Sequence, residues 1–243
     1  MNNYFIKNDY QINPVNKSIE TAGQDIFWNE RNIRISRLSQ FYVYQMAKQI
    51  AVEKGLSSIL DIGCGVATQL NAFFGDGKFQ IFGVDQPHAI EICKKIHKGG
   101  TYTSDNFENP SYSLRSHLDK ASLIICADVI EHLENPDHLL NYIKKFSDNN
   151  TYIVISTPER DAKHGRTAYK PKNPYHIREW NREEFTKYLS FSGFEIITHT
   201  TVHAQRLIWG WPHFKLVITK AIRLLPLKDT QVVVTRLKGS FHE

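Results

Sequence analysis

Two carboxylates and two histidines have the types and spacing that suit either metal binding or proton transfer. Asp128, Glu131 and His132 close or directly follow the apolar run 121–128, and His176 lies in an irregular segment after the next apolar run. Spacings of three and four residues bring Glu131 and His132 near Asp128 if the turn there is helical. Carboxylates and imidazoles that meet at one sheet edge are ligands for a divalent cation such as Mg²⁺, Mn²⁺, Fe²⁺ or Zn²⁺.

The same group also allows a chemistry without metal. Because a histidine has an unperturbed pKa near 6.5, His132 is the best general base by type and place, and His176 is second. A structural role stays open for Glu131, which could only shape the turn. The sequence does not decide whether the histidines are ligands or bases.

A glycine loop is the second chemical feature. Gly63 and Gly65 directly follow the apolar segment 57–62, so the chain turns tightly and a ligand can approach bare backbone at a helix start. Asp85 ends the next apolar segment 20 residues after Gly65 (85 − 65), where a carboxylate takes both ribose hydroxyls. Thr68 replaces the third glycine of the dinucleotide fingerprint, which disfavours a nicotinamide or flavin site. A plain turn is the structural alternative, but together these residues favour an adenosine-type ligand.

Alternating strand and helix patterns must position these residues. Predicted strands cover residues 57–62, 79–85, 101–105, 121–128, 151–157, 194–202 and 231–237, and predicted helices cover 29–54, 66–74, 87–98, 136–146 and 182–191. This alternation predicts an α/β fold with a doubly wound, mostly parallel, seven-stranded sheet. The last two strands flank residues 203–230 and are expected to form an antiparallel edge.

Length and composition bound the class of protein. The 243 residues are 41% hydrophobic and 23% charged, which is the globular range and suits one or two domains. The net charge of +5 weakly favours an anionic partner. No uncharged apolar run approaches the length of a membrane span, and no secretory signal is visible. The three cysteines (Cys64, Cys93 and Cys126) cannot all pair, so we expect a reducing cytoplasm.

Four segments resemble a known family in order and spacing. ILDIGCG (59–65), GVD (83–85), Asp105 and ICADVIEHLENP (125–136) are similar to the class I S-adenosylmethionine-dependent methyltransferases over about residues 30–200. The resemblance implies a Rossmann-like methyltransferase fold with S-adenosylmethionine as cofactor. It also implies cofactor contacts from Asp61, Gly63, Gly65, Cys126 and Ala127 to the methionine part, from Asp85 and Gln86 to the ribose, and from Asp105, Asn106 and Phe107 to the adenine. A solvated polar turn is the alternative for Asp105.

The run DVIEHLENP, followed by STPER and HIREW, resembles two branches of that family. One branch comprises enzymes found with surface-polysaccharide and sugar biosynthesis genes. The other comprises small-RNA 3′-terminal 2′-O-methyltransferases, whose carboxylates and histidines hold magnesium against a ribose diol. The second likeness implies a metal site in which an aspartate stands where that pattern has a glutamate, with the ligands Asp128, Glu131, His132 and His176.

These likenesses imply methyl transfer to the oxygen of a small hydroxyl or phosphate-like acceptor. A sugar or nucleotide-linked precursor in surface-glycan (capsular polysaccharide) biosynthesis is the favoured acceptor. RNA ribose 2′-O-methylation is the alternative, but the modest charge and the lack of a recognisable RNA-binding module disfavour nucleic acid. A non-catalytic protein that binds the cofactor and supports another methyltransferase is the third possibility. The sequence leaves the oligomeric state open.

The remaining segments are expected to surround the site. Residues 1–30 form an N-terminal extension, and residues 31–243 form the methyltransferase domain. Within that domain, residues 158–180 are a loop that covers the substrate, and 203–230 are a helical insertion that serves as a lid, a dimer contact or a weak membrane-surface contact. Basic residues of the loop either meet a phosphate or are merely solvated: Arg160, Lys163, His164, Arg166, Lys170, Lys172 and Arg178. Residues 25–32 fold over the cofactor or simply pack.

Overall fold

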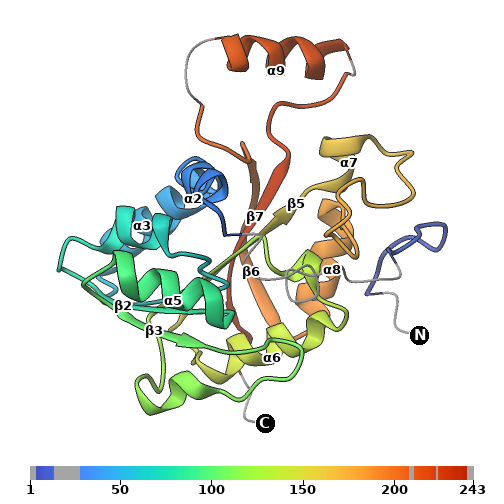
Figure 1. Cartoon of the computed structure of the whole chain (residues 1–243). Coiled ribbons are helices and arrows are strands. Elements are labelled where there is room, and N and C mark those ends of the chain that lie inside the picture. Colours follow the sequence, from blue (N-terminus) through green and yellow to red (C-terminus); the bar gives the residue numbers. More distant parts are fainter. Residues whose placement is uncertain (1–3, 14–27, 208–210, 223, 240–243) are drawn as a thin grey trace.

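A seven-stranded sheet lies at the centre of the computed structural model, which describes residues 4–13, 28–207, 211–222 and 224–239 (Figure 1). Its strands stand in the order β3-β2-β1-β4-β5-β7-β6. The chain runs outward from β1 to β3 and then returns to β4 beside β1, so the strand order reverses between β1 and β4. The strand bounds are β1 Ser58–Ile62, β2 Gln80–Asp85, β3 Thr101–Ser104, β4 Leu123–Ala127, β5 Tyr152–Pro158, β6 Phe194–Val202 and β7 Thr230–Leu237.

The pairing of the strands confirms the predicted fold class. The first five strands pair in parallel, and β7 pairs antiparallel with both β5 and β6. Strands of a parallel sheet are covered on both faces, which is why β4 is apolar without alternation and buried along its whole length. The carboxyl ends of β1 to β5 therefore meet at one edge of the sheet.

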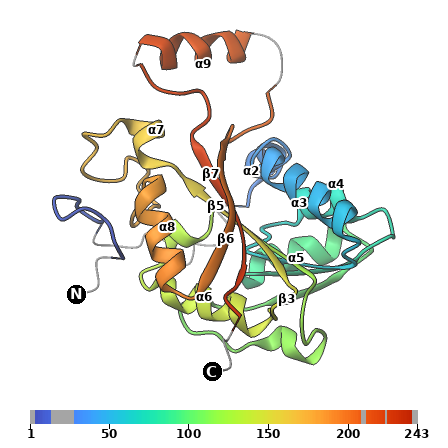
Figure 2. The same ribbon diagram turned by 180° about the vertical axis from the view of Figure 1, so that it is seen from behind.

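Helices cover both faces of this sheet, as the views from front and back show (Figures 1 and 2). Successive residues of a strand point to opposite faces, so Ile59 and Leu60 belong to separate apolar clusters, one under α3 to α5 and one under α6 and α8. All three cysteines are buried free thiols. The helix bounds are α2 Glu30–Ser36, α3 Phe41–Lys54, α4 Thr68–Phe74, α5 Pro87–Ile96, α6 Pro136–Lys145, α7 Arg160–His164, α8 Arg182–Phe191 and α9 Trp211–Ile222, with short 3-10 turns η1 Ser113–Ser116 and η2 Ile130–His132.

The single helix predicted over residues 29–54 is wrong, because α2 and α3 are separate helices. Gln40 adopts a left-handed conformation (φ 60°) at the start of α3. Two carbonyls freed at the break, those of Ser36 and Ser39, accept hydrogen bonds from Nε2 of Gln69 at 3.1 and 2.8 Å. The apolar spacing continues through the break and therefore hid it. The predicted end of the helix at Gly55 is confirmed, with φ 63°.

The described part of the N-terminal extension lies along the segment before α8. The backbone N–H groups of Gln11 and Asn13 donate to the carbonyls of Tyr169 and Ile177, and Nε1 of Trp180 donates to the carbonyl of Tyr4. Residues 1–3 and 14–27 of the expected extension lie outside the described residues. Residues 4–13 thus fasten the expected cover loop to the body of the protein.

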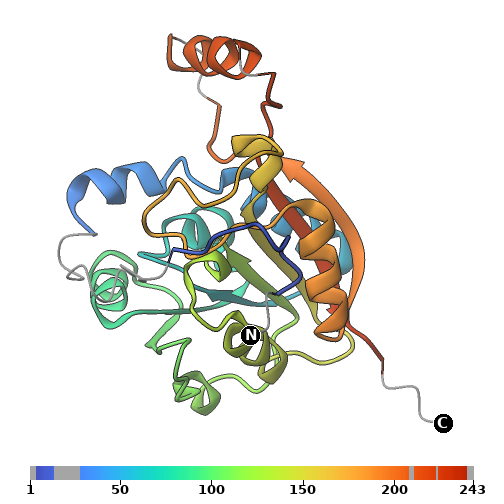
Figure 3. The ribbon, with the colours of Figure 1, turned by 90° about the vertical axis from the view of Figure 1, so that its right-hand side faces the viewer.

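Helix α9 projects away from the sheet, as the side view shows (Figure 3). Its Lys220 donates to Oδ2 of Asp229 at 2.8 Å and to the carbonyl of Ala162 at 3.3 Å. This lysine ties α9 to α7. Among the described residues, no helix combines the length and the apolar character needed to cross a membrane.

Candidate functional site

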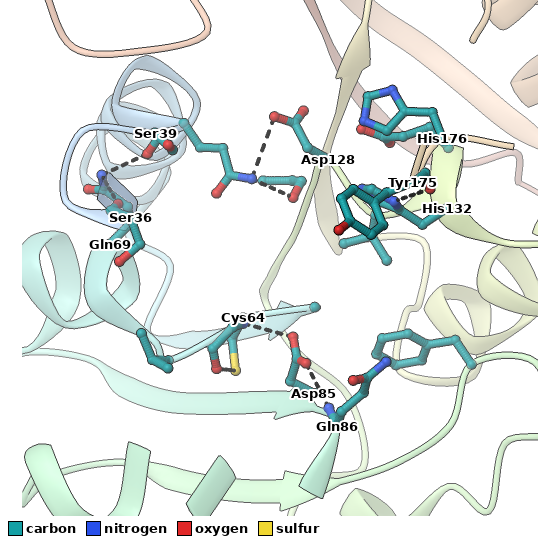
Figure 4. A pocket seen from close by; sticks show the side chains of 18 of the residues that line it. Ser36, Ser39, Cys64, Gln69, Asp85, Gln86, Asp128, His132, Tyr175 and His176 are labelled. Carbon is teal, nitrogen blue, oxygen red and sulfur yellow. Dashed lines mark hydrogen bonds between the residues drawn. The ribbon is translucent and has the colours of Figure 1, made fainter. Parts of the chain in front are cut away.

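A cavity of about 500 Å³ opens at the carboxyl ends of β1, β2, β4 and β5, where the strand order reverses. Open α/β sheets bind their ligands at such a place. Figure 4 shows Asp85 and Gln86 on one side of it and His132, Tyr175 and His176 on the other. We call these sides the glycine-loop half and the histidine half.

Both glycines of the loop are required by its geometry. Gly63 and Gly65 have φ values of 79° and 56°, which other residues rarely adopt. A Cβ atom on Gly63 would lie 2.2 Å from the side chain of Val129, and one on Gly65 would lie 2.6 Å from the ring of Trp28. The loop therefore presents bare backbone under the Trp28 ring, which lines the cavity.

Asp85 and Gln86 form the wall next to this loop. The carboxylate of Asp85 accepts hydrogen bonds from the backbone N–H groups of Gly65 (2.8 Å) and Gln86 (2.7 Å), which fix its position. The buried Oε1 of Gln86 has no hydrogen-bond partner within the described residues. A buried acceptor without a donor costs free energy, so this oxygen is suited to a ligand hydroxyl or amino group.

Asp61 and Cys126 lie behind the cavity wall. Asp61 is fully buried and accepts a hydrogen bond from the hydroxyl of Tyr44 at 2.7 Å. Burial, opposed by that hydrogen bond, raises the pKa of Asp61 to about 7. Neither Asp61 nor Cys126 lines the cavity, whereas Tyr44 and Ala127 do. The structure thus places Tyr44 between Asp61 and the ligand space.

Asp105 lines the cavity but is already engaged with its own loop. Its carboxylate accepts five hydrogen bonds, from the backbone of Asn106, Ser111 and Ser113 and from the hydroxyls of Ser111 and Tyr142. A carboxylate offers about four lone-pair sites. Asp105 therefore holds the loop that carries Asn106 and Phe107, and those two residues face the same cavity.

Asp128 begins the histidine half and is held by two neighbours. It adopts a left-handed conformation (φ 55°), and its Oδ1 accepts from the hydroxyl of Ser156 at 2.7 Å. Gln40 donates from Nε2 to the carbonyl of Ala127 at 3.0 Å and reaches Oδ2 of Asp128 at 3.5 Å. The break between α2 and α3 is what brings Gln40 to this strand end.

Glu131, His132 and His176 come together as predicted. One ligand atom of each lies within 4.8 Å of the others, and Asp128 is not part of this group. The two imidazole rings meet edge to face with centroids 4.8 Å apart. The 3-10 turn η2 places Glu131 and His132, and His176 arrives from 44 residues further along the chain (176 − 132).

Hydrogen bonds fix the orientation of both rings. Nδ1 of His132 lies 2.8 Å from the carbonyl of Tyr175, and Nδ1 of His176 lies 2.6 Å from Oε1 of Glu179. A carbonyl and an ionised carboxylate only accept hydrogen bonds, so each Nδ1 carries a proton, and Nε2 is the nitrogen of each ring that can act as ligand or base. Oε2 of Glu179 in turn lies 3.0 Å from Nε2 of His164.

The electrostatics of the group follow from its burial. Burial raises the pKa of Glu131 well above its usual range, the nearby Asp128 raises it further, and Oε1 of Glu131 has no described hydrogen-bond partner. Burial of the ring and the neighbouring His176 lower the pKa of His132 to about 4. Burial also acts on Glu179, but the hydrogen bonds from His164 and His176 prevail and lower its pKa to about 2. At neutral pH, His132 is therefore a neutral imidazole and Glu179 is a carboxylate.

Several residues of the site were missed by sequence reasoning. Gln40 and Tyr175 carried no recognisable signal, because they contact residues more than 40 positions away. Glu179 stands three residues after His176, a spacing that could have suggested the pair. Trp28 belongs to residues 25–32, for which the sequence leaves cofactor cover and plain packing open. Its ring lies over Gly65.

Comparisons with known proteins place the chain in a family. The model described as "Methyltransferase domain" matches residues 29–199. No curated protein matches the chain. Because the family model covers well over half of the 243 residues, the prediction of a methyltransferase is confirmed.

Solved structures share the fold at low sequence identity. A chain from the complex between the Haloferax volcanii Trm112 methyltransferase activator and a methyltransferase is 11% identical, with a TM-score of 0.67 over 94% of this chain and all of that one. The plantazolicin methyltransferase BpumL, in complex with a monoazolic desmethyl-plantazolicin analogue and SAH, is 16% identical, with a TM-score of 0.62 over 93% of this chain and 95% of that one.

The [4+2]-cyclase SpnF is 14% identical, with a TM-score of 0.66 over 95% of this chain and all of SpnF. This fold therefore also occurs in a protein named for another reaction, and structural likeness alone does not fix the chemistry. The family model decides the point: the chain belongs to the methyltransferase domain family.

Proposed function

We propose that this chain transfers a methyl group from S-adenosylmethionine to a hydroxyl oxygen of a small acceptor, a sugar or nucleotide-linked sugar in surface-glycan biosynthesis in the cytoplasm. The observation that carries the proposal is that one cavity joins a glycine loop with a strand-end aspartate to a pair of imidazoles that hydrogen bonds orient. The family supports S-adenosylmethionine as the methyl donor.

The glycine-loop half fits this cofactor. Asp85 is positioned by two backbone N–H groups to accept from ribose hydroxyls, and Oε1 of Gln86 offers an acceptor that lacks a partner. Gly63 and Gly65 leave room for the methionine part, and the loop held by Asp105 presents Asn106 and Phe107 to the adenine. When bound, the cofactor supplies a methyl group on an already activated sulfonium.

The histidine half supplies the proton chemistry. His132 is neutral, its Nδ1 is held by the carbonyl of Tyr175, and Nε2 is the ring nitrogen that takes the proton of an acceptor hydroxyl. His176 has the same orientation through Glu179 and serves as the second candidate. Positioning in line with the methyl group is the other contribution that the cavity makes.

The same residues fit a divalent cation. Glu131 Oε1 is an orphaned buried oxygen, and the two histidines have Nδ1 hydrogen-bonded to a carbonyl and a carboxylate, the usual support of metal-binding histidines. Glu131, His132 and His176 would hold the ion, with Asp128 too far to join them without movement. A cation there would lower the pKa of an acceptor hydroxyl.

A melting curve with S-adenosylhomocysteine tests the cofactor site first. At about 100 times its dissociation constant, a ligand stabilises by about 2.7 kcal/mol, which is roughly 5–10 °C in a chain of this size. We expect this shift in chelator and a further rise with Mg²⁺ or Mn²⁺. An unchanged melting temperature with the ligand would overturn the proposed function. The absence of a metal effect would assign removal of the acceptor's hydroxyl proton to His132 without a metal.

A second experiment separates the acceptors. Transfer of labelled methyl groups is measured to sugars, nucleotide sugars and short RNA with free 3′ ends. A sugar acceptor should be insensitive to salt, whereas RNA binding should weaken steeply as salt rises. Cofactor binding without turnover on any acceptor would instead support a non-catalytic partner protein.

A further inference from the structure

The basic residues of the loop 158–180 have different surroundings in the structure. Arg160 is buried and pairs with Glu184 at 2.7 Å, and Arg178 donates to the carbonyls of Leu133 and Glu134. The side chains of three others are exposed and do not line the cavity: Arg166, Lys170 and Lys172. Lys163 alone among the Lys and Arg residues of the described chain lines the cavity.

At the cavity wall, the ammonium of Lys163 has no partner within the described part of the chain. Among the described residues, no carboxylate lies within 4.0 Å of its Nζ, and Nζ makes no hydrogen bond. Lys220, on the helix tied to α7, shows the contrast, because it pairs with Asp229 at 2.8 Å. A half-buried ammonium without a counter-charge is a costly arrangement unless a ligand completes it.

The backbone around Lys163 is held firmly, so its placement at the cavity is built into the fold. Arg160 N–H donates to the carbonyl of Trp180, and the N–H of Ala162 donates to the carboxylate of Glu159. The carbonyl of Ala162 accepts from Lys220. Its N-cap Glu159 and two separate segments, those of Trp180 and Lys220, thus fix the short helix that carries Lys163.

The carboxylates that line the cavity contact groups other than this ammonium. Glu131 accepts a hydrogen bond from the hydroxyl of Thr157 at 2.9 Å. Asp85, Asp105 and Glu108 accept hydrogen bonds from backbone N–H groups of their own walls, and Asp128 accepts from Ser156. The ammonium of Lys163 is therefore a cation at the cavity wall with no described carboxylate in contact with it.

We propose that Lys163 binds an anionic group, a phosphate or a carboxylate, on the acceptor whose hydroxyl lies at His132. This inference rests on the proposed function, because it names the chemical class of acceptor for that site. An ammonium forms charge-assisted hydrogen bonds with either anion, and it would select acceptors that carry one over neutral sugars.

The test titrates ¹⁵N-labelled protein, saturated with S-adenosylhomocysteine, with inorganic phosphate, acetate and uncharged glycerol at fixed ionic strength. We expect saturable shifts of the amides of α7 and the histidine half with an anion but not with glycerol. Lys163→Gln should weaken anion binding at least tenfold. Lys172→Gln, which removes an exposed lysine of the same loop, should leave it unchanged.

The outcomes are distinct. A preference for phosphate or for acetate identifies which anion the acceptor carries. No saturable anion binding to the wild type, or equal binding by wild type and Lys163→Gln, overturns the inference. An effect of Lys163→Gln on metal-induced stabilisation alone would also overturn it and assign Lys163 to the ionisation of Glu131. Absence of shifts with S-adenosylhomocysteine would contradict the proposed function instead, and the anions would then be titrated into the ligand-free protein.

Discussion

The two halves of the cavity are built by different means. In the glycine-loop half, the positions are set by backbone: Gly63 and Gly65 turn the chain, and N–H groups next to Asp85 hold its carboxylate. In the histidine half, two segments far apart in the sequence orient each other's residues. The carbonyl of Tyr175 holds the ring of His132, and Glu179 holds the ring of His176. The glycine-loop half is therefore largely a local structure, whereas the histidine half exists only in the folded chain.

Removing the imidazole of His132 should produce the largest effect. Because general base catalysis contributes about 10²- to 10⁴-fold, His132→Ala should lower kcat by that factor and leave S-adenosylhomocysteine affinity unchanged. Labelled methyl transfer to the acceptor and the ligand-induced melting shift measure the two quantities. Full turnover of the variant would contradict the role of His132, and loss of cofactor affinity would show that the halves are not separate.

Removing the carboxylate of Asp85 should give the opposite pattern with a smaller effect. Asp85→Ala loses charge-assisted hydrogen bonds to the ribose and should weaken S-adenosylhomocysteine binding about 100-fold. Asp85→Asn keeps an acceptor for the N–H of Gly65 and serves as the control for the loop. Metal-induced stabilisation should persist in both variants. Its loss would show that metal binding in the histidine half depends on Asp85.

Changing Glu179 tests the side-chain support of the histidine half. Glu179→Gln keeps the shape but no longer fixes the proton on Nδ1 of His176, so metal affinity should fall by about tenfold. Titration of metal-induced melting measures this effect. Glu183→Gln, an exposed partner of Lys187, is the matched control. Unchanged metal affinity in Glu179→Gln would exclude a positioning role.

The pH dependence of stability should show the smallest difference between the two halves. The pKa of Asp61 is raised to about 7, so its contribution to stability falls as pH rises from about 4 to 7. The pKa of His132 is lowered to about 4, so its contribution falls as pH drops from 6.5 to 4.

In chelator, therefore, Asp61→Asn should make stability rise more steeply with pH over this window, and His132→Gln should make it rise less. Each effect is bounded by about 1.4 kcal/mol per pH unit. Melting temperatures between pH 4.5 and 7 measure both slopes. Parallel curves for wild type and variants would mean that neither group titrates differently in the folded protein.

The sequence by itself determined the parts whose causes are local. Continuous apolar runs predicted the parallel strands, and glycines at Gly55, Gly63 and Gly65 marked turns where positive φ is required. Asp85 could be placed because the end of a strand fixes where its side chain lies. The helix predicted from residue 182 does begin there, and Asn181 and Glu184 form both hydrogen bonds of its capping box.

The hydrogen-bonding and binding roles of several side chains depend on the tertiary structure and do not follow from residue type. Asp105 accepts five hydrogen bonds from residues near and far, and Gln40 reaches a strand end because a helix breaks. Lys163 is distinguished from the six other basic residues of its loop by its place at the cavity. Such roles depend on burial and on groups distant in sequence, and burial sets the pKa and the hydrogen-bond needs of a side chain. The sequence therefore determined the fold and the glycine-loop half, and packing determined the histidine half.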